Sequence, residues 1–213
     1  MRIFAAAAPP FMKNGYLVAA DAGPEAVLID PGDEVADLVN AAAREQLDVT
    51  AILLTHAHLD HITGMSAATT AFPRAESWLQ PEDDVLYRAV VQQGQMFGLR
   101  VEPQPPVDRF YAAGQRLTVG ALEIAIHPTP GHSPGSVCLE IRDGASVELF
   151  VGDTLFAGSI GRTDLPGGDY DTLIRSIRTV LFAFPDATAV HSGHGPATTI
   201  GRERTGNPFL REA

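Results

Sequence analysis

One segment of this chain limits its possible folds more than any other, because it places several ionisable side chains at the end of an apolar run. Residues 49–54 form an apolar run, with Thr50 as the one polar residue, and have the length of a strand that is covered on both faces. The chain then continues as His56-Ala57-His58-Leu59-Asp60-His61, which is too polar for a core and lies where the strand gives way to a helix. The fold must therefore bring three imidazoles and a carboxylate to the end of one buried strand.

In this segment the spacing of the polar residues suits metal binding. Imidazoles and carboxylates are natural ligands of divalent zinc, iron or manganese. In an extended loop the alternate residues His56 and His58 can face one ion, and Asp60 and His61 can face a second ion once the chain bends into the helix. The alternative is a polar loop whose histidines cap that helix, but three histidines and one aspartate within six residues favour the metal site.

The other four histidines lie in two further windows, 127–132 and 191–194, and each window follows or closes a predicted strand. Loops at strand ends can converge on one point in space, so residues that are distant in sequence can form one site. The sequence therefore predicts that all three histidine windows approach one another.

Three side chains outside the first window are candidate ligands. His132 lies in a rigid Gly-His-Ser-Pro-Gly turn, where glycine allows close approach of the backbone; taken alone, this turn supports a ligand and a structural histidine equally. Asp153 follows an apolar strand, where a bare carboxylate is costly unless a cation meets it, so it is a candidate bridging ligand, with a turn cap as the alternative. His194, between two glycines, is the last candidate. For His127 and His191 we prefer a structural role.

Hydrophobic periodicity indicates an α/β protein with two strand-rich halves, each flanked by helices. The patterns predict helices over 35–42, 62–70, 82–96 and 171–181, and strands over 2–7, 15–20, 26–29, 49–54, 77–79, 116–119, 122–126, 136–141, 147–151 and 187–190. No repeat or low-complexity tract marks a boundary. We therefore expect residues 1–213 to form a single domain in which two sheets pack together with helices outside.

Composition excludes several classes of function. Fifteen Lys and Arg against 26 Asp and Glu leave a net charge of −11, which repels phosphate backbones and argues against nucleic-acid binding. The apolar runs are all shorter than the roughly 18–20 residues needed to cross a bilayer, so we expect no membrane insertion. The single cysteine, Cys138, excludes an internal disulfide and is compatible with a reducing compartment. We expect a cytoplasmic protein.

The candidate ligands, in this order and at these spacings, resemble the metal motifs of the metallo-β-lactamase superfamily. Ile29-Asp30-Pro31-Gly32 is similar to an early motif of that superfamily, so the resemblance covers nearly the whole chain. It implies a four-layer αβ/βα sandwich of two packed mixed sheets, with the metal site at one edge. It also implies a first ion held by His56, His58 and His132, a second ion held by Asp60, His61 and His194, and Asp153 as the bridge. Zinc is the expected metal, with iron or manganese as alternatives. Asp60 and Asp153 are the expected catalytic residues.

Within the superfamily, segments 158–168 and 195–210 resemble the glyoxalase II-like (hydroxyacylglutathione hydrolase-like) thioesterases of the short bacterial type. This resemblance implies metal-dependent hydrolysis of S-(2-hydroxyacyl)glutathione-type thioesters. Longer glyoxalase II enzymes add a C-terminal helical domain that contacts glutathione, which we do not expect here. Two alternatives stay open: a persulfide dioxygenase with one iron, whose family shares Gly161-Arg162-Thr163-Asp164, and another metallo-hydrolase such as a lactonase.

The expected chemistry is attack on a thioester carbonyl by a hydroxide that bridges two ions, since even one zinc can bring the pKa of a bound water to about 7. A thiol of pKa near 8.5 can leave as the thiolate without a dedicated general acid. Arg162 is a candidate contact for an anionic substrate tail, with a structural pairing to Asp164 as the alternative, and Tyr170 is a weaker candidate. We expect a small-molecule thioester as the substrate of a monomer or homodimer.

Overall fold

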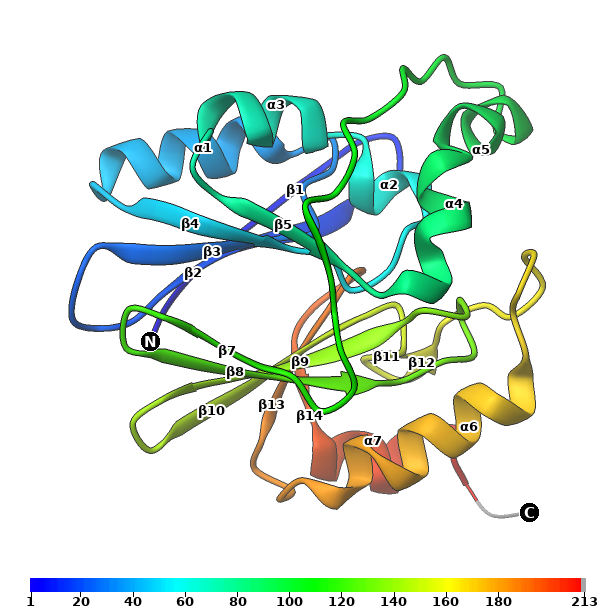
Figure 1. Cartoon of the computed structure of the whole chain (residues 1–213). Coiled ribbons are helices and arrows are strands. Elements are labelled where there is room, and N and C mark those ends of the chain that lie inside the picture. Colours follow the sequence, from blue (N-terminus) through cyan, green and yellow to red (C-terminus); the bar gives the residue numbers. More distant parts are fainter. Residues whose placement is uncertain (212–213) are drawn as a thin grey trace.

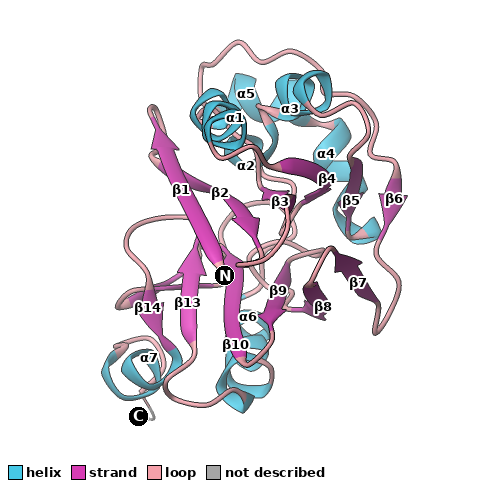
Figure 2. Cartoon of the chain, turned by 90° about the vertical axis from the view of Figure 1, so that its left-hand side faces the viewer, coloured by secondary structure: helices cyan, strands magenta, loops and turns pink. Residues whose placement is uncertain are grey.

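The computed structural model describes residues 1–211 as two mixed β-sheets that pack face to face, with helices on their outer faces (Figure 1). In the view turned by 90°, helices α1 and α3 lie above the first sheet and helices α6 and α7 lie below the second (Figure 2). The order of layers is therefore helix, sheet, sheet, helix, which confirms the predicted α/β class and the αβ/βα sandwich.

The first sheet has the strand order β1-β2-β3-β4-β5-β6. Its strands are β1 (Arg2–Ala8), β2 (Lys13–Ala19), β3 (Glu25–Ile29), β4 (Asp48–Leu53), β5 (Glu76–Leu79) and β6 (Arg109–Phe110). Strands β1 to β3 are antiparallel and strands β3 to β6 are parallel. The parallel strands β3 and β4 therefore release the chain at the same edge of the sheet.

The second sheet has the strand order β14-β13-β10-β9-β8-β7. Its strands are β7 (Arg116–Val119), β8 (Leu122–Pro128), β9 (Val137–Asp143), β10 (Ser146–Gly152), β13 (Ala189–Ser192) and β14 (Thr198–Thr199). Only the β10–β13 pair is parallel. A separate hairpin is formed by β11 (Leu155–Phe156) and β12 (Ser159–Ile160).

Seven helices cover the two sheets in the described part of the chain. They are α1 (Val35–Arg44), α2 (Leu59–Ile62), α3 (Met65–Ala71), α4 (Asp84–Arg88), α5 (Val90–Met96), α6 (Tyr170–Thr179) and α7 (Ile200–Gly206). The N-terminus of α6 is capped by the Asp169 carboxylate, which accepts a hydrogen bond from the Thr172 N–H. No helix of residues 1–211 has the length and hydrophobicity that a membrane span requires.

The alternation of side chains along the strands divides the core into a layer between the two sheets and two layers between the sheets and their helices. Successive side chains of a strand point to opposite faces of its sheet. Val18 and Val27 accordingly pack between the two sheets, whereas Leu17 and Leu28 pack against the helices outside the first sheet. Beneath the second sheet, Leu173 of α6 and its neighbours form the third cluster. Both faces of each central strand are thus covered, as the continuous apolar runs predict.

The predicted continuous helix over 82–96 is wrong. The chain instead forms a 3₁₀ turn (Pro81–Asp83), helix α4 and helix α5. At the break the Leu86 carbonyl accepts from the Ala89 N–H at 3.1 Å and from the Gln93 side-chain amide at 2.8 Å. These bonds lie at the turn where α4 ends and α5 begins. The two-residue strands and α7 were not predicted either, because they are too short to show a period.

Candidate metal centre

The loop 54–58 is held in an extended conformation by side chains from distant segments. The Asp83 carboxylate accepts a hydrogen bond from the Ala57 N–H at 2.9 Å. The buried Gln93 side chain donates to the Ala57 carbonyl and accepts from the Leu59 N–H, both at 3.0 Å. His58 itself is extended, with φ −70° and ψ 151°, and α2 begins at the next residue. This change from extended loop to helix directs the first two histidines and the following Asp-His pair to different places.

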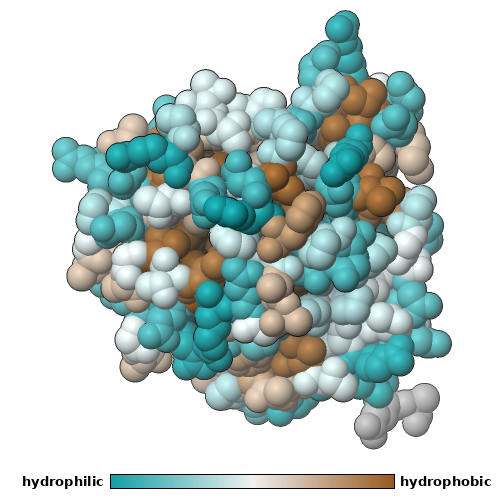
Figure 3. All heavy atoms as spheres, viewed as in Figure 1, coloured by the Kyte–Doolittle hydropathy of each residue, from teal (hydrophilic) through white to brown (hydrophobic). Residues whose placement is uncertain are grey.

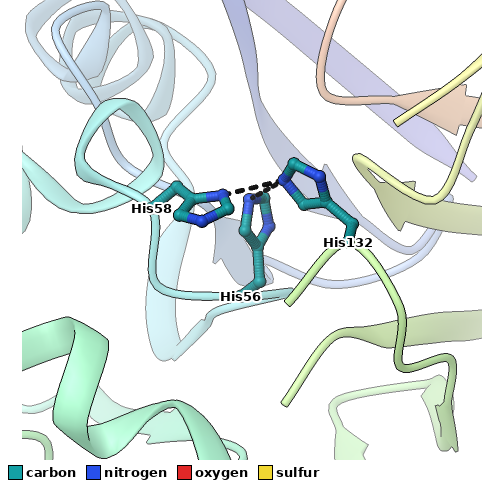
Figure 4. A group of neighbouring side chains, drawn as sticks. All are labelled: His56, His58 and His132. Carbon is teal, nitrogen blue, oxygen red and sulfur yellow. Dashed lines mark hydrogen bonds between the residues drawn. The ribbon is translucent and has the colours of Figure 1, made fainter. Parts of the chain in front are cut away.

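Three histidines converge from two loops (Figure 4). His58 Nδ1 lies 2.8 Å from His132 Nε2, which in turn lies 3.2 Å from His56 Nε2. Nitrogen ligands of a tetrahedral zinc at the usual bond length lie about 3.3 Å apart. Burial lowers the pKa of His56 well below its ordinary value and that of His58 to about 3, which leaves both rings neutral. These rings can hold one divalent ion.

A second group of donors adjoins the first. His194 Nε2 lies 3.2 Å from Asp60 Oδ2 and 3.4 Å from Asp153 Oδ2. His61 Nε2 lies 3.3 Å from Asp153 Oδ1. Asp153 Oδ2 is also 3.6 Å from Nε2 of His132, a member of the first group. The Asp153 carboxylate thus lies between the two groups.

Two buried atoms of the second group have no hydrogen-bond partner in the described part of the chain and are suited to bind a cation. His61 Nε2 and Asp153 Oδ1 lack a hydrogen-bond partner among the described residues, although they lie 3.3 Å apart. Leaving a buried polar atom unpaired costs about 1–3 kcal/mol. Both atoms belong to the nitrogen and oxygen donor types that zinc, iron and manganese take. This donor set fits a divalent ion.

The charges of the second group agree with that fit. Burial of the His61 ring lowers its pKa, but the carboxylates of Asp153, Asp60 and Asp30 outweigh burial and raise it to about 10. For His194 the carboxylates likewise outweigh burial and raise the pKa to about 9. Burial raises the pKa of the Asp153 carboxyl, yet the adjacent imidazoles hold it well below its usual range. The carboxylates thus stay ionised and attract positive charge, which a divalent ion provides.

Neighbouring groups orient three of the rings toward the centre. His61 Nδ1 donates to Asp30 Oδ2 at 2.9 Å, and His132 Nδ1 donates to the Arg162 carbonyl at 2.7 Å. His56 Nδ1 lies 3.1 Å from Thr55 Oγ1. Because the outer nitrogen of each ring is engaged, Nε2 is left to face the centre.

The orienting role of Asp30 was not predicted from the sequence. Its carboxylate also accepts from the Thr55 N–H at 2.7 Å and from Thr55 Oγ1 at 2.6 Å, so it links the ends of the parallel strands β3 and β4. The available signal was its position directly after an apolar strand, the same position that singled out Asp153.

The remaining predicted residues divide between the centre and its surroundings. The Arg162 guanidinium makes a two-point contact with Asp164 at 2.7 Å, the structural pairing considered as the alternative. Tyr170 is exposed at the start of α6 and is absent from the described cavity lining. His127 and His191 lie apart from the ligand groups, 2.7 Å from Glu140 and 2.8 Å from Glu148 respectively.

A cavity of about 150 Å³ opens onto the two ligand groups. Besides candidate ligands, it is lined by Phe11, Leu59, Gln93, Phe97, Arg162 and Leu165. Apart from the candidate ligands, Arg162 is the one charged residue in this described lining. A small substrate can therefore reach the centre along a mainly apolar surface.

Gly131 permits a close approach that positions His132. It has φ +134°, and a Cβ added there would lie 2.3 Å from the backbone nitrogen of Leu173 in α6. We expect Gly131→Ala to lower the free energy of unfolding by about 2–3 kcal/mol, because a backbone atom cannot rotate away from the clash. Gly144→Ala is the matched control, since Gly144 also has a positive φ but meets nothing within 4 Å. Denaturant unfolding checks the difference, and equal losses in the two variants would contradict the clash.

Comparison with known proteins assigns the family. The family model described as the metallo-beta-lactamase superfamily matches residues 8–194. Hydroxyacylglutathione hydrolase GloC of Haemophilus influenzae is 39% identical over 202 residues, which are 94% of this chain and 93% of that protein. The crystal structure of BLEG-1 B3 metallo-beta-lactamase covers 99% of this chain and all of its own, with 38% identity and a TM-score of 0.91. The structure of TTHA1623 in a di-iron-bound form covers 97% of this chain and all of its own, with 40% identity and a TM-score of 0.85. This chain belongs to the metallo-beta-lactamase superfamily.

Proposed function

We propose that this protein is a hydrolase of S-(2-hydroxyacyl)glutathione-type thioesters that works with two divalent metal ions. The observation that carries the proposal is the pair of adjoining ligand groups that share the Asp153 carboxylate. A mononuclear site needs one such group, whereas among the described residues His56, His58 and His132 form one group and Asp60, His61 and His194 form another. The 39% identity to the Haemophilus influenzae hydroxyacylglutathione hydrolase GloC supports the substrate class.

We assign the first ion to His56, His58 and His132 and the second to Asp60, His61 and His194, with Asp153 shared between them. Two bound ions supply a water of lowered pKa and positive charge for the carbonyl oxygen of the substrate. Zinc is the metal we expect, and the di-iron form of a structural relative makes iron the first alternative. Asp60 and Asp153 are the carboxylates that line the cavity, so they are placed to accept a proton from the attacking water.

The leaving group favours a thioester over an amide. Hydrolysis breaks the carbonyl carbon–sulfur bond and forms a carbon–oxygen bond, and sulfur departs as a thiolate. A thiolate of pKa near 8.5 needs no proton on departure. Apart from the candidate ligands, the cavity lining carries no carboxyl, imidazole or thiol among the described residues. The residues around the centre therefore match a reaction whose leaving group needs no proton donor.

β-Lactam hydrolysis is the second candidate, favoured by the TM-score of 0.91 to BLEG-1 B3 metallo-beta-lactamase. It needs the same attack on a carbonyl carbon. Its leaving nitrogen, however, must gain a proton, and apart from the candidate ligands the described cavity lining has no carboxyl, imidazole or thiol to supply one. We therefore expect slower hydrolysis of a penicillin than of a thioester by the same preparation.

The decisive test incubates the purified protein, loaded with zinc, iron or manganese, with S-lactoylglutathione and separately with glutathione persulfide. We expect thiol release from the thioester without oxygen consumption, and two ions per chain by elemental analysis. Chelation should abolish thiol release because it removes both ions. His58→Ala should abolish it because the first ion loses a ligand. Oxygen uptake on the persulfide without thioester cleavage would instead establish the persulfide dioxygenase and overturn the hydrolase.

A further inference from the structure

An apolar side cavity opens beside the candidate metal centre. It is lined by Leu86, Met96, Phe97, Leu165 and Pro166 and has a volume of about 40 Å³. It shares four lining residues with the cavity over the ligand groups: His58, Gln93, Phe97 and Leu165. A group held in the side cavity therefore lies directly beside the reacting carbonyl of a substrate bound at the centre.

The walls of the side cavity come from α4, α5 and the loop that follows β12. Met96 and Phe97 at the end of α5 are 65% and 43% exposed, which is unusual for large apolar side chains. The space-filling view shows hydrophobic residues gathered at the upper right, over α4, α5 and the loop after them (Figure 3). A ligand that covers these side chains removes apolar surface from water and gains affinity.

The side cavity cannot take the polar end of a glutathione thioester. No Asp, Glu, Lys or Arg is among its described lining residues. The tripeptide carries two carboxylates and an ammonium group, and burying unpaired charges in an apolar cavity is strongly unfavourable. A larger cavity of about 420 Å³ adjoins the centre at Phe11 and Leu59, and its polar and charged lining residues are Asp33, Thr63, Ser66, Arg100, Glu102 and Gln104. The thiol portion thus has a separate and more polar route, which leaves the side cavity for the acyl chain.

We propose that this side cavity binds the acyl side chain and selects apolar side chains of three to four carbons over the methyl group of lactate. The inference rests on the proposed thioester hydrolysis and names its acyl specificity. A cavity of about 40 Å³ has room for about three water-sized groups, since each needs roughly 10–15 Å³. A methyl group underfills this space, and an unbranched chain of six carbons exceeds it.

The test uses glutathione thioesters that differ in the acyl side chain alone: 2-hydroxypropanoyl, 2-hydroxypentanoyl, 2-hydroxy-4-methylpentanoyl and 2-hydroxyoctanoyl. Each additional buried methylene group is expected to raise kcat/KM about fourfold. We therefore expect kcat/KM to rise at least about tenfold from the first to the second or third compound and to fall for the fourth. Equal values across the series, a preference for 2-hydroxypropanoyl, or a continued rise to 2-hydroxyoctanoyl would each overturn the proposal.

Two variants locate the effect. Met96→Ala removes part of the cavity wall at an exposed position where folding tolerates truncation, and it should lower the ratio of kcat/KM for 2-hydroxy-4-methylpentanoyl over 2-hydroxypropanoyl about fivefold. Val85→Ala is the matched control, since Val85 is 77% exposed on α4 and lies outside the lining. It should leave the ratio unchanged. An equal drop in both variants, or none in Met96→Ala, would contradict the assignment.

Binding of thioethers separates this inference from the proposed function. S-propylglutathione, S-(4-methylpentyl)glutathione and S-octylglutathione carry the methyl, 2-methylpropyl and hexyl side chains at the same distance from sulfur as the acyl compounds. They cannot be hydrolysed, and calorimetry gives their affinities for the metal-loaded protein. We expect the 4-methylpentyl compound to bind about tenfold more tightly than the propyl compound. That preference together with uncleaved thioesters would support the cavity and overturn the hydrolase. Cleaved thioesters without any side-chain preference would support the hydrolase and overturn the cavity.

Discussion

Replacing Asp153 with asparagine is expected to lower thioester hydrolysis about a thousandfold and to reduce bound metal from two ions to one or none. The amide keeps the volume of the carboxylate but loses its negative charge. Asp153 lies within 3.6 Å of ring nitrogens from both ligand groups, so this single charge serves both ions. Metal ions contribute several kcal/mol to the stabilisation of a hydrolytic transition state, and about 4 kcal/mol corresponds to a thousandfold change in rate.

Elemental analysis and the rate of thiol release measure the two effects on the same preparation. Asp186→Asn is the control, because Asp186 is an exposed carboxylate that pairs with Arg204 far from the ligand groups. It should retain both the metal and the rate. If Asp153→Asn retained two ions per chain and full activity, Asp153 would not be the shared ligand.

Lys13→Met is expected to lower the free energy of unfolding by about 3–5 kcal/mol, the cost of leaving one partner of a buried ion pair uncompensated. Lys13 Nζ lies 2.5 Å from Glu34 Oε1 and also donates to the Asp30 carbonyl, and the two charged side chains are 2% and 1% exposed. The variant leaves the Glu34 carboxylate buried without its cation. For a chain of this size we expect the melting temperature to fall by about 6–20 °C.

The double variant Lys13→Met with Glu34→Leu tests this reason. Removing both charges should recover most of the loss, because two apolar side chains of similar volume need no compensation. Arg74→Ala provides the surface comparison, since the Arg74–Asp48 pair is exposed, and we expect a change within about 1 kcal/mol. A double variant as unstable as Lys13→Met alone would show that packing of the lysine stem, and not its charge, holds this region.

Local sequence patterns predicted most of the secondary structure, because a helix or strand that is buried on one or both faces has apolar residues at a regular spacing or in a continuous run. The apolar runs in β3, β4 and β10 and the helical spacing in α1 and α6 are confirmed. The break between α4 and α5 was not predicted; at this break the Leu86 carbonyl accepts a hydrogen bond from the Gln93 side chain. A hydrophobic pattern indicates which side chains are buried, but it does not indicate which backbone carbonyls accept hydrogen bonds from side chains.

The sequence by itself determined the chemical character of the candidate centre and the family of the fold. Residue types and their distances from strand ends are local properties, so His56, His58 and Asp153 could be singled out before any contact was known. Only the tertiary structure decided that Asp30 orients His61, that Lys13 and Glu34 form a buried pair, and that an apolar cavity lies beside the ligand groups. Each of these depends on the distance between segments far apart in the chain. That distance is determined by how the two sheets and their helices pack, which no single stretch of sequence contains.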